Sequence, residues 1–311
     1  MTQTGASAEC PPPGIRVVST ARALCAESPL WDPRHAALCW TDIDGRHLFR
    51  APQPGGEVFA RPMPGRVGCI ALHHAGGYVA AIEDRLMRLG PDFSPEETLG
   101  TAGFDPAVQR FNDGKADPWG AYFWVGSIFL PRTRTAAGLW RLGPDGALAK
   151  VLEGFTTVNG IAWSPDGRTM YVSDSWHRTI WAADYDPAQG EISRRRVHYR
   201  LAPVQGRPDG AAVDCDGFYW CAGFGGGQLL RIAPDGRLDR TVRMPMRCPT
   251  MPAFGGEGAD ILFVTSYGDL AALPELANDP MAGEVIALNL NVRGRPEAAL
   301  TLGAGDAARG R

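Results

Sequence analysis

The chain is poor in the features that mark membrane, secreted and nucleic-acid-binding proteins. None of its 311 residues belongs to a run approaching the roughly 18 consecutive apolar residues of a membrane helix, and the N-terminus shows no apolar core of a signal peptide. The formal net charge is −3, without the clustered basic face that nucleic acid requires. These absences predict a cytoplasmic protein without a membrane or nucleic acid partner.

Motifs of histidine, cysteine and serine chemistry are missing as well. The six histidines contain no H-x-H or H-E-x-x-H spacing, the seven cysteines form no C-x-x-C pair, and no G-x-S-x-G elbow occurs. The glycine-rich segment 223–227 lacks the final glycine and the following helix of a dinucleotide loop. Redox, serine-nucleophile and dinucleotide-dependent chemistry are therefore not expected.

The chain has a repeat instead. Six short strand-like segments recur at 39–42, 78–81, 123–126, 171–174, 219–222 and 263–266. The second residues of these segments are 39 to 48 positions apart, which is the period of a β-propeller blade. Turns such as Pro144-Asp145-Gly146 separate the apolar runs. The repeat predicts an all-β, six-bladed β-propeller over 15–302 as one domain, with a flexible lead-in at 1–14 and a flexible tail at 303–311.

A second apolar run lies 11 to 14 positions before each segment, and in four of the six blades it is preceded by a residue with a carboxylate or carboxamide side chain. The four residues are Glu27, Asn112, Asn159 and Asp209. Innermost strands of a propeller run along its central channel, so equivalent strand starts are expected to converge. Two carboxylates and two carboxamides around one point predict a site for a divalent cation. Asp174 and His177 stay open between a role at the channel mouth and purely local contacts.

Four segments resemble the signature motifs of one family, the senescence marker protein, gluconolactonase and luciferin-regenerating enzyme superfamily. They are Ala26–Asp32, Arg110–Lys115, Val158–Gly167 and Pro208–Gly210. Each motif alone is weak, but the four stand in the right order at blade spacing, and the resemblance extends from about residue 16 to 290.

This resemblance implies a six-bladed propeller that hydrolyses a sugar lactone with one catalytic metal held by Glu27, Asn159 and Asp209. It also implies that Arg110 and Asn112 bind the substrate. One divalent ion can polarise the ester carbonyl, activate water and stabilise the oxyanion. Asp209 is then the candidate acceptor for the proton of the water. Oxygen ligands leave calcium, zinc, manganese, magnesium and iron(II) open.

One departure from the animal branch of the family concerns the substrate. That branch tends to place acidic residues after the third-blade strand, where this chain has the apolar segment Ile128-Phe129-Leu130. The identity of the lactone, for example glucono-, xylono- or arabinonolactone, is therefore open. Five aromatic residues are candidates for the mouth of the channel, with packing between blades as the alternative: Trp119, Tyr122, Phe129, Trp176 and Phe224.

Two other functions remain as alternatives. A related propeller with a metal site could hydrolyse phosphotriesters such as organophosphates. A non-catalytic protein could bind ions or serve as a scaffold for partners. The sequence gives no indication of the oligomeric state.

Overall fold

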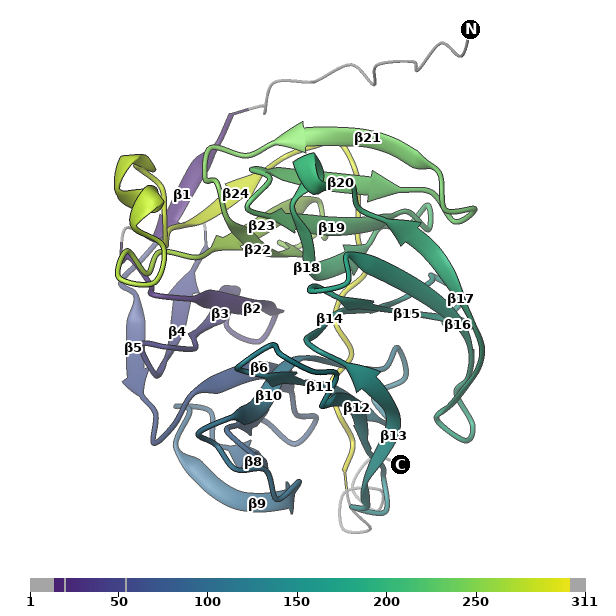
Figure 1. The fold of residues 1–311 in the computed structure, drawn as a ribbon. Helices are drawn as coiled ribbons and strands as arrows, with labels where there is room; N and C mark the ends of the chain where they lie inside the picture. The colour runs from purple at the N-terminus through teal and green to yellow at the C-terminus, as the bar shows by residue number, and fades with distance from the viewer. Residues whose placement is uncertain (1–13, 20, 54, 303–311) are drawn as a thin grey trace, which may run out of the picture.

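The computed structural model describes residues 14–19, 21–53 and 55–302, which form six four-stranded antiparallel sheets around one axis (Figure 1). The protein is a six-bladed β-propeller, and the predicted fold is confirmed. Residues 1–13 of the predicted lead-in and the predicted tail at 303–311 lie outside the described residues. No helix in the described part of the chain is long and apolar enough to cross a membrane.

Each of the first five blades is a run of four consecutive strands. Blade one comprises β2 (Ala26–Asp32), β3 (Ala37–Asp42), β4 (His47–Pro52) and β5 (Phe59–Pro62). Blade two comprises β6 (Val67–Leu72), β7 (Tyr78–Ile82), β8 (Arg85–Leu89) and β9 (Pro95–Thr101). Blade three comprises β10 (Gln109–Ala116), β11 (Phe123–Phe129), β12 (Ala137–Leu142) and β13 (Leu148–Phe155).

Blade four comprises β14 (Val158–Trp163), β15 (Thr169–Asp174), β16 (Thr179–Asp186) and β17 (Glu191–Arg200). Blade five comprises β18 (Arg207–Val213), β19 (Tyr219–Phe224), β20 (Gln228–Ile232) and β21 (Leu238–Arg243). The 3-10 helices η1 (Pro203–Gln205) and η2 (Pro274–Asn278) lie in connections.

Blade six joins the two ends of the chain. Its strands β22 (Pro249–Gly255), β23 (Ile261–Ser266) and β24 (Val285–Leu288) come from the C-terminal part, and β1 (Arg16–Ser19) pairs with β24 as the outermost strand. The first strands of the six blades, β2, β6, β10, β14, β18 and β22, contact one another in ring order and line the channel. The ring is therefore closed by strand pairing between residues about 270 positions apart, such as Arg16 and Ala287.

The second strand of each blade supplies one central residue of the core, and its size alternates around the ring. Trp40, Trp124 and Trp220 are fully buried in blades one, three and five. The equivalent positions of the other three blades carry valine: Val79, Val172 and Val264. Trp124 shares a core cluster with Val172, and Trp220 shares one with Val264. At these two blade boundaries a large and a small side chain thus share one core cluster, which helps to fill the space between tilted sheets.

The three Pro-Asp-Gly turns predicted from the sequence are confirmed. In each of them, Oδ1 of the aspartate accepts a hydrogen bond of 3.0 Å from the backbone N–H two residues later. The aspartates are Asp145, Asp166 and Asp235. These carboxylates accept hydrogen bonds within their own turns, so we assign them a structural and not a catalytic role.

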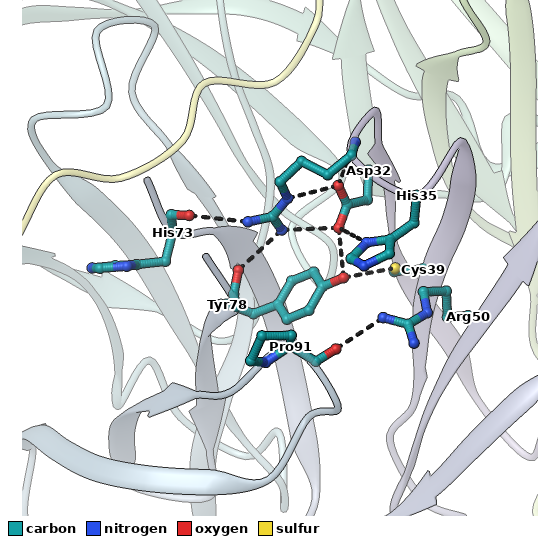
Figure 2. Close-up of polar contacts among 9 residues, drawn as sticks. Asp32, His35, Cys39, Arg50, His73, Tyr78 and Pro91 are labelled. Carbon is teal, nitrogen blue, oxygen red and sulfur yellow. Dashed lines mark hydrogen bonds and ion pairs between the residues drawn. The ribbon is translucent and has the colours of Figure 1, made fainter. Parts of the chain in front are cut away.

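A polar junction connects blades one and two (Figure 2). The fully buried Asp32 at the end of β2 accepts hydrogen bonds from the Tyr78 hydroxyl (2.6 Å) and from Arg34 Nη2 (2.8 Å). Arg34 also donates to the carbonyl oxygens of His73 and Gly77 in blade two. Burial alone would raise the pKa of Asp32, but the hydrogen bonds from Arg34, Tyr78 and His35 hold it well below its usual range. The carboxylate therefore stays charged and ties the two blades together.

The C-terminal segment 293–302 crosses the end of the channel at which the innermost strands finish. In Figure 1 it runs in yellow behind β14 and continues toward the lower blades. Its backbone pairs with blades five, two and three in turn, through Arg293, Leu300 and Thr301. Lys115 at the end of β10 donates a 2.6 Å ion-pair contact to Glu297. This segment covers one end of the channel, and the opposite end carries the cavity described next.

Candidate active site

The four oxygen-bearing residues expected to converge lie on one cavity of about 180 Å³. They come from the starts of β2, β10, β14 and β18, and all are buried, with exposed fractions of 4% for Asn159, 7% for Glu27 and 8% for Asn112 and Asp209. Arg110 lines the same cavity. The structure thus brings together all five residues that the sequence predicted for the site.

A repeated irregularity of the backbone positions these side chains. The strand register shifts near the start of every innermost strand, between residues 27 and 30, 67 and 69, 111 and 114, 159 and 162, 208 and 211, and 249 and 252. Such β-bulges bend a strand and redirect the side chain at that point. At Asn159 the bulge includes Gly160 with φ +62, where a Cβ would lie 2.2 Å from the Tyr219 hydroxyl. Only glycine fits there.

A chain of side-chain hydrogen bonds runs through the site across three blades. Arg110 Nη1 donates to Asn112 Oδ1 at 2.7 Å, and Asn112 Nδ2 donates to Asn159 Oδ1 at 2.8 Å. Asn159 Nδ2 in turn donates to Asp209 Oδ1 at 2.6 Å and to Ser175 Oγ at 2.8 Å. The polar groups on this side of the cavity are therefore held in one fixed arrangement.

Glu27 and Asp209 are two buried carboxylates without a basic partner. Neither forms an ion pair with a lysine, arginine or histidine of the described residues. Burial, with added repulsion from Asp209 and Asp113, raises the pKa of Glu27 well above its usual range. Burial and the nearby Asp113 likewise raise the pKa of Asp209. Two uncompensated carboxylates in one buried cavity are costly for the fold.

This donor set fits a divalent cation. A cation between Glu27 and Asp209 would remove the electrostatic cost. Asn159 would add an amide oxygen of the kind that hard cations accept once its amide is turned over, because its nitrogen faces Asp209 in this structure and its oxygen faces Asn112. The described residues hold no cluster of three or more histidine, cysteine, aspartate or glutamate side chains that could bind a metal. A site here therefore depends on the carboxamide as well as on the two carboxylates. The assignment of these three residues as ligands stays a prediction.

The rest of the cavity is partly apolar. Ile128 and Leu130 line it, as expected from the sequence, and so do Trp176 and Phe224. Phe129 does not, because its ring lies beneath the Arg134 guanidinium at 4.8 Å. The expectation for Trp119 and Tyr122 was also wrong. Their rings pack near Gly167 and Gly190, in turns of blade four away from the cavity.

Asp174 and His177 make local contacts and are not among the residues that line the cavity. Asp174 accepts hydrogen bonds from the backbone N–H groups of Thr156 and Trp176, and from His177 Nδ1 at 2.9 Å. Asp42 plays the same part in blade one, where it accepts from the N–H groups that precede β2. Both carboxylates therefore order the loop that leads into an innermost strand.

The sequence did not single out three charged residues that line the cavity: Asp44, Arg132 and Arg207. Asp44 and Arg132 lie in loops, and their position along the chain gives no sign of where they point. The place of Arg207 in the repeat could have indicated its role from the sequence. It stands two residues before Asp209, as Arg110 stands two residues before Asn112, so the two arginines hold equivalent places in the fifth and third repeats.

Comparison with known proteins identifies a family model, relatives by sequence and a solved structure with the same fold. The sequence matches the family model described as the SMP-30/Gluconolactonase/LRE-like region over residues 25–268. It is 35% identical over 284 residues to 6-deoxy-6-sulfogluconolactonase of Pseudomonas putida, covering 91% of this chain and 97% of that protein. It is 34% identical over 289 residues to regucalcin of Gallus gallus, with 91% and 96% covered. The fold of a calcium-binding regucalcin from Agrobacterium tumefaciens matches with a TM-score of 0.88 at 24% identity, covering 94% and 98%.

Proposed function

The chain belongs to the SMP-30/gluconolactonase/LRE-like family, and we propose that it hydrolyses the internal ester of a sugar lactone with one divalent cation held by Glu27, Asn159 and Asp209. The observation that supports the cation is the pair of buried carboxylates without a basic partner in one cavity. The relative named 6-deoxy-6-sulfogluconolactonase supports the reaction class.

The cation, when bound, supplies Lewis-acid polarisation of the ester carbonyl and makes a neighbouring water more acidic. Side chains of the protein take up the proton and bind the substrate. Asp209 accepts the proton that the attacking water loses, because it is a carboxylate at the buried end of the cavity and, among the described residues, Asn159 is its one side-chain donor. Its general-base role belongs to the proposal.

Arg110 and Asn112 orient the substrate. The Arg110 side chain lines the cavity, and its Nη1 donates to Asn112 and to the Phe111 carbonyl, so its planar guanidinium is held where it can donate to a sugar hydroxyl or the carboxylate product. Asn112 is already held between Arg110 and Asn159, which fixes the plane of its amide. A preset arrangement of donors lowers the cost of ordering the site around the substrate.

The size of the cavity favours a single sugar ring. A cavity of about 180 Å³ suits a monocyclic lactone. The walls formed by Ile128 and Leu130 offer no hydrogen bond to a hydroxyl on that side. We therefore propose a lactone that presents an apolar edge to this wall.

The test is hydrolysis of a panel of aldonolactones by acid release at constant pH, corrected for spontaneous opening. Glucono-, galactono-, xylono- and arabinonolactone are assayed after chelation and after readdition of calcium, zinc, manganese, magnesium or iron(II). Turnover that stops with chelator and returns with one metal supports the proposal and identifies the ion. Activity that persists after complete removal of metal would contradict the cation. Absence of turnover with every lactone, together with cleavage of a phosphotriester or ion binding alone, would favour one of the alternatives.

A further inference from the structure

We propose that the outer rim of the cavity is an anion-binding subsite, formed by Arg132 and Arg207, and that the substrate is a sugar lactone bearing a fixed negative group. The group would be a sulfonate, phosphate or carboxylate at the end of the carbon chain away from the ester carbonyl. This inference rests on the proposed lactone hydrolysis and names the substrate class for that same site.

The first support is that these two arginines lack an anionic partner. Both line the cavity, and neither forms an ion pair or a side-chain hydrogen bond with another described residue. Elsewhere in the chain, arginines such as Arg196 and Arg231 do pair with aspartates. Two arginines without an anionic partner on one cavity leave positive charge that a bound anion can compensate.

The second support is that several arginine side chains lie around one cavity. Arg132 and Arg207 line the same cavity, and Arg110 lines it as well. Three guanidinium groups therefore lie around one cavity. The Arg207 guanidinium is fixed over the Trp176 ring at 4.3 Å, which leaves its edges free to donate to an anion in the planar manner that suits sulfonate, phosphate and carboxylate.

The third support is the position of this rim relative to the predicted cation site. Arg207 begins the strand that carries Asp209 two residues later. Trp176 follows Ser175, whose hydroxyl accepts a hydrogen bond from Asn159. Trp176 is 43% exposed and Arg132 is also exposed, whereas Asn159 and Asp209 are buried. A ligand that spans the cavity would thus place its ester at the buried end and its far end beside the arginines.

The charge of the cavity points in the same direction. Among the described residues, its lining carries three carboxylates (Glu27, Asp44 and Asp209) and three arginines (Arg110, Arg132 and Arg207). The protein groups alone are therefore balanced, and a bound divalent cation would leave an excess of two positive charges. A neutral lactone makes no use of that excess. A lactone with a singly or doubly charged substituent compensates it and gains from its field.

The experiment compares matched lactones that differ only at the sixth carbon: glucono-δ-lactone, its 6-phosphate and its 6-deoxy-6-sulfonate. Values of kcat/KM are measured for the metal-loaded wild-type protein and for Arg207→Gln and Arg132→Gln, with spontaneous opening subtracted. Arg134→Gln is the matched control, because Arg134 lies in the same loop as Arg132 but packs over Phe129 and does not line the cavity.

We expect the wild type to favour at least one charged lactone over glucono-δ-lactone by about tenfold or more, the usual worth of a charge-assisted hydrogen bond. The two cavity variants should reduce that ratio by a similar factor, mainly through KM, and Arg134→Gln should leave it unchanged. Raising the salt concentration should also reduce the ratio. A preference for the sulfonate or for the phosphate alone identifies the anion.

Two outcomes overturn the proposal. Equal kcat/KM for the neutral and both charged lactones in the wild type would show that no anion is recognised, while leaving lactone hydrolysis itself intact. If the Arg207 and Arg132 variants favour the charged lactones by the same ratio of kcat/KM as the wild type, the anion binds elsewhere. Absence of turnover with all three lactones would instead count against the proposed function, and this inference would fail with it.

Discussion

The amide nitrogen of Asn159 lies 2.6 Å from Oδ1 of Asp209, so the innermost strands of blades four and five meet through their side chains at the floor of the cavity. The same nitrogen contacts Ser175 Oγ at 2.8 Å. Asn159 therefore couples the position of a candidate ligand in blade five to the loop that carries Trp176.

Asp209→Asn should abolish stabilisation by divalent cations. The wild type, with a cation at about 100 times its Kd, should gain roughly 2.7 kcal/mol in free energy of unfolding, and the variant should gain little. Thermal unfolding after chelation and after readdition of metal measures this directly. Glu257→Gln is the control, because Glu257 is exposed in the loop between β22 and β23. A variant that keeps the full metal-dependent shift would remove Asp209 from the site.

Arg110→Ala should impair the handling of substrate and spare the cation. Arg110 contacts Asn112 and the Phe111 carbonyl and makes no hydrogen bond to Glu27, Asn159 or Asp209. We expect kcat/KM to fall about tenfold to a hundredfold, the effect of losing charge-assisted hydrogen bonds. The metal-dependent shift in unfolding temperature should stay near the wild-type value. An equal loss of both properties would argue against separate roles.

Trp124→Ala should destabilise the fold strongly. Trp124 is fully buried between blades three and four and packs with Val172. Removing a large core aromatic costs about 3–5 kcal/mol, because it loses apolar burial and leaves a cavity. Denaturant unfolding checks the value. Val204→Ala, at a residue that is 78% exposed, should change the free energy of unfolding by less than about 0.5 kcal/mol.

Tyr78→Phe should weaken the junction of blades one and two in a pH-dependent way. The variant loses the 2.6 Å hydrogen bond to Asp32, at a cost of about 1–3 kcal/mol near neutral pH. The folded-state pKa of Asp32 is depressed, so the stability that its charge contributes is present above its ordinary pKa and is lost as pH falls through the folded value. The difference between the two proteins should therefore shrink in acid. A difference that is constant with pH would contradict this linkage.

His198 should make the protein less stable in mild acid. Burial, followed by repulsion from Arg196, lowers the pKa of His198 to about 4. Between its ordinary value near 6.5 and this value, the unfolded chain takes up a proton that the folded chain does not, so stability falls as pH drops through that window. The loss should be about 2 kcal/mol, less than the full shift, because the ring is partly exposed.

The measurement is the pH dependence of the free energy of unfolding from pH 7 to pH 4. His198→Gln should flatten the slope in this range, and His74→Gln, at an exposed position, should leave it as in the wild type. An unchanged slope in the His198 variant would assign the acid sensitivity to other groups.

The sequence predicted the blades well because each blade carries its own local signal. The apolar segments around Trp40, Trp124 and Trp220 recur at blade spacing, and all six predicted segments fall on the second strands of the structure. The convergence of Glu27 and Asp209 followed from the same repeat, since equivalent strand starts must meet at the axis. The family resemblance was confirmed by the comparisons.

The sequence could not predict what depends on side-chain direction in loops. Trp119 and Trp176 are both exposed aromatic residues, yet only Trp176 faces the cavity. Arg132 follows β11 with φ +54, a local backbone geometry that sequence patterns for arginine do not suggest. The bulges were also missed, although the glycines after Asn159 and Asp209 mark two of them.

The joining of β1 to β24 has a consequence for how the protein is made. Glu27 is synthesised early, but the blade that closes the ring beside it cannot form until the residues of β24 have been synthesised. At about 5–20 residues per second, that interval lasts roughly 15–50 s. During translation the first blades stand with open edges and unshielded apolar faces, which chaperones and aggregation partners can recognise. A premature stop codon before Val285 would therefore cost the cell the whole ring and not a single blade.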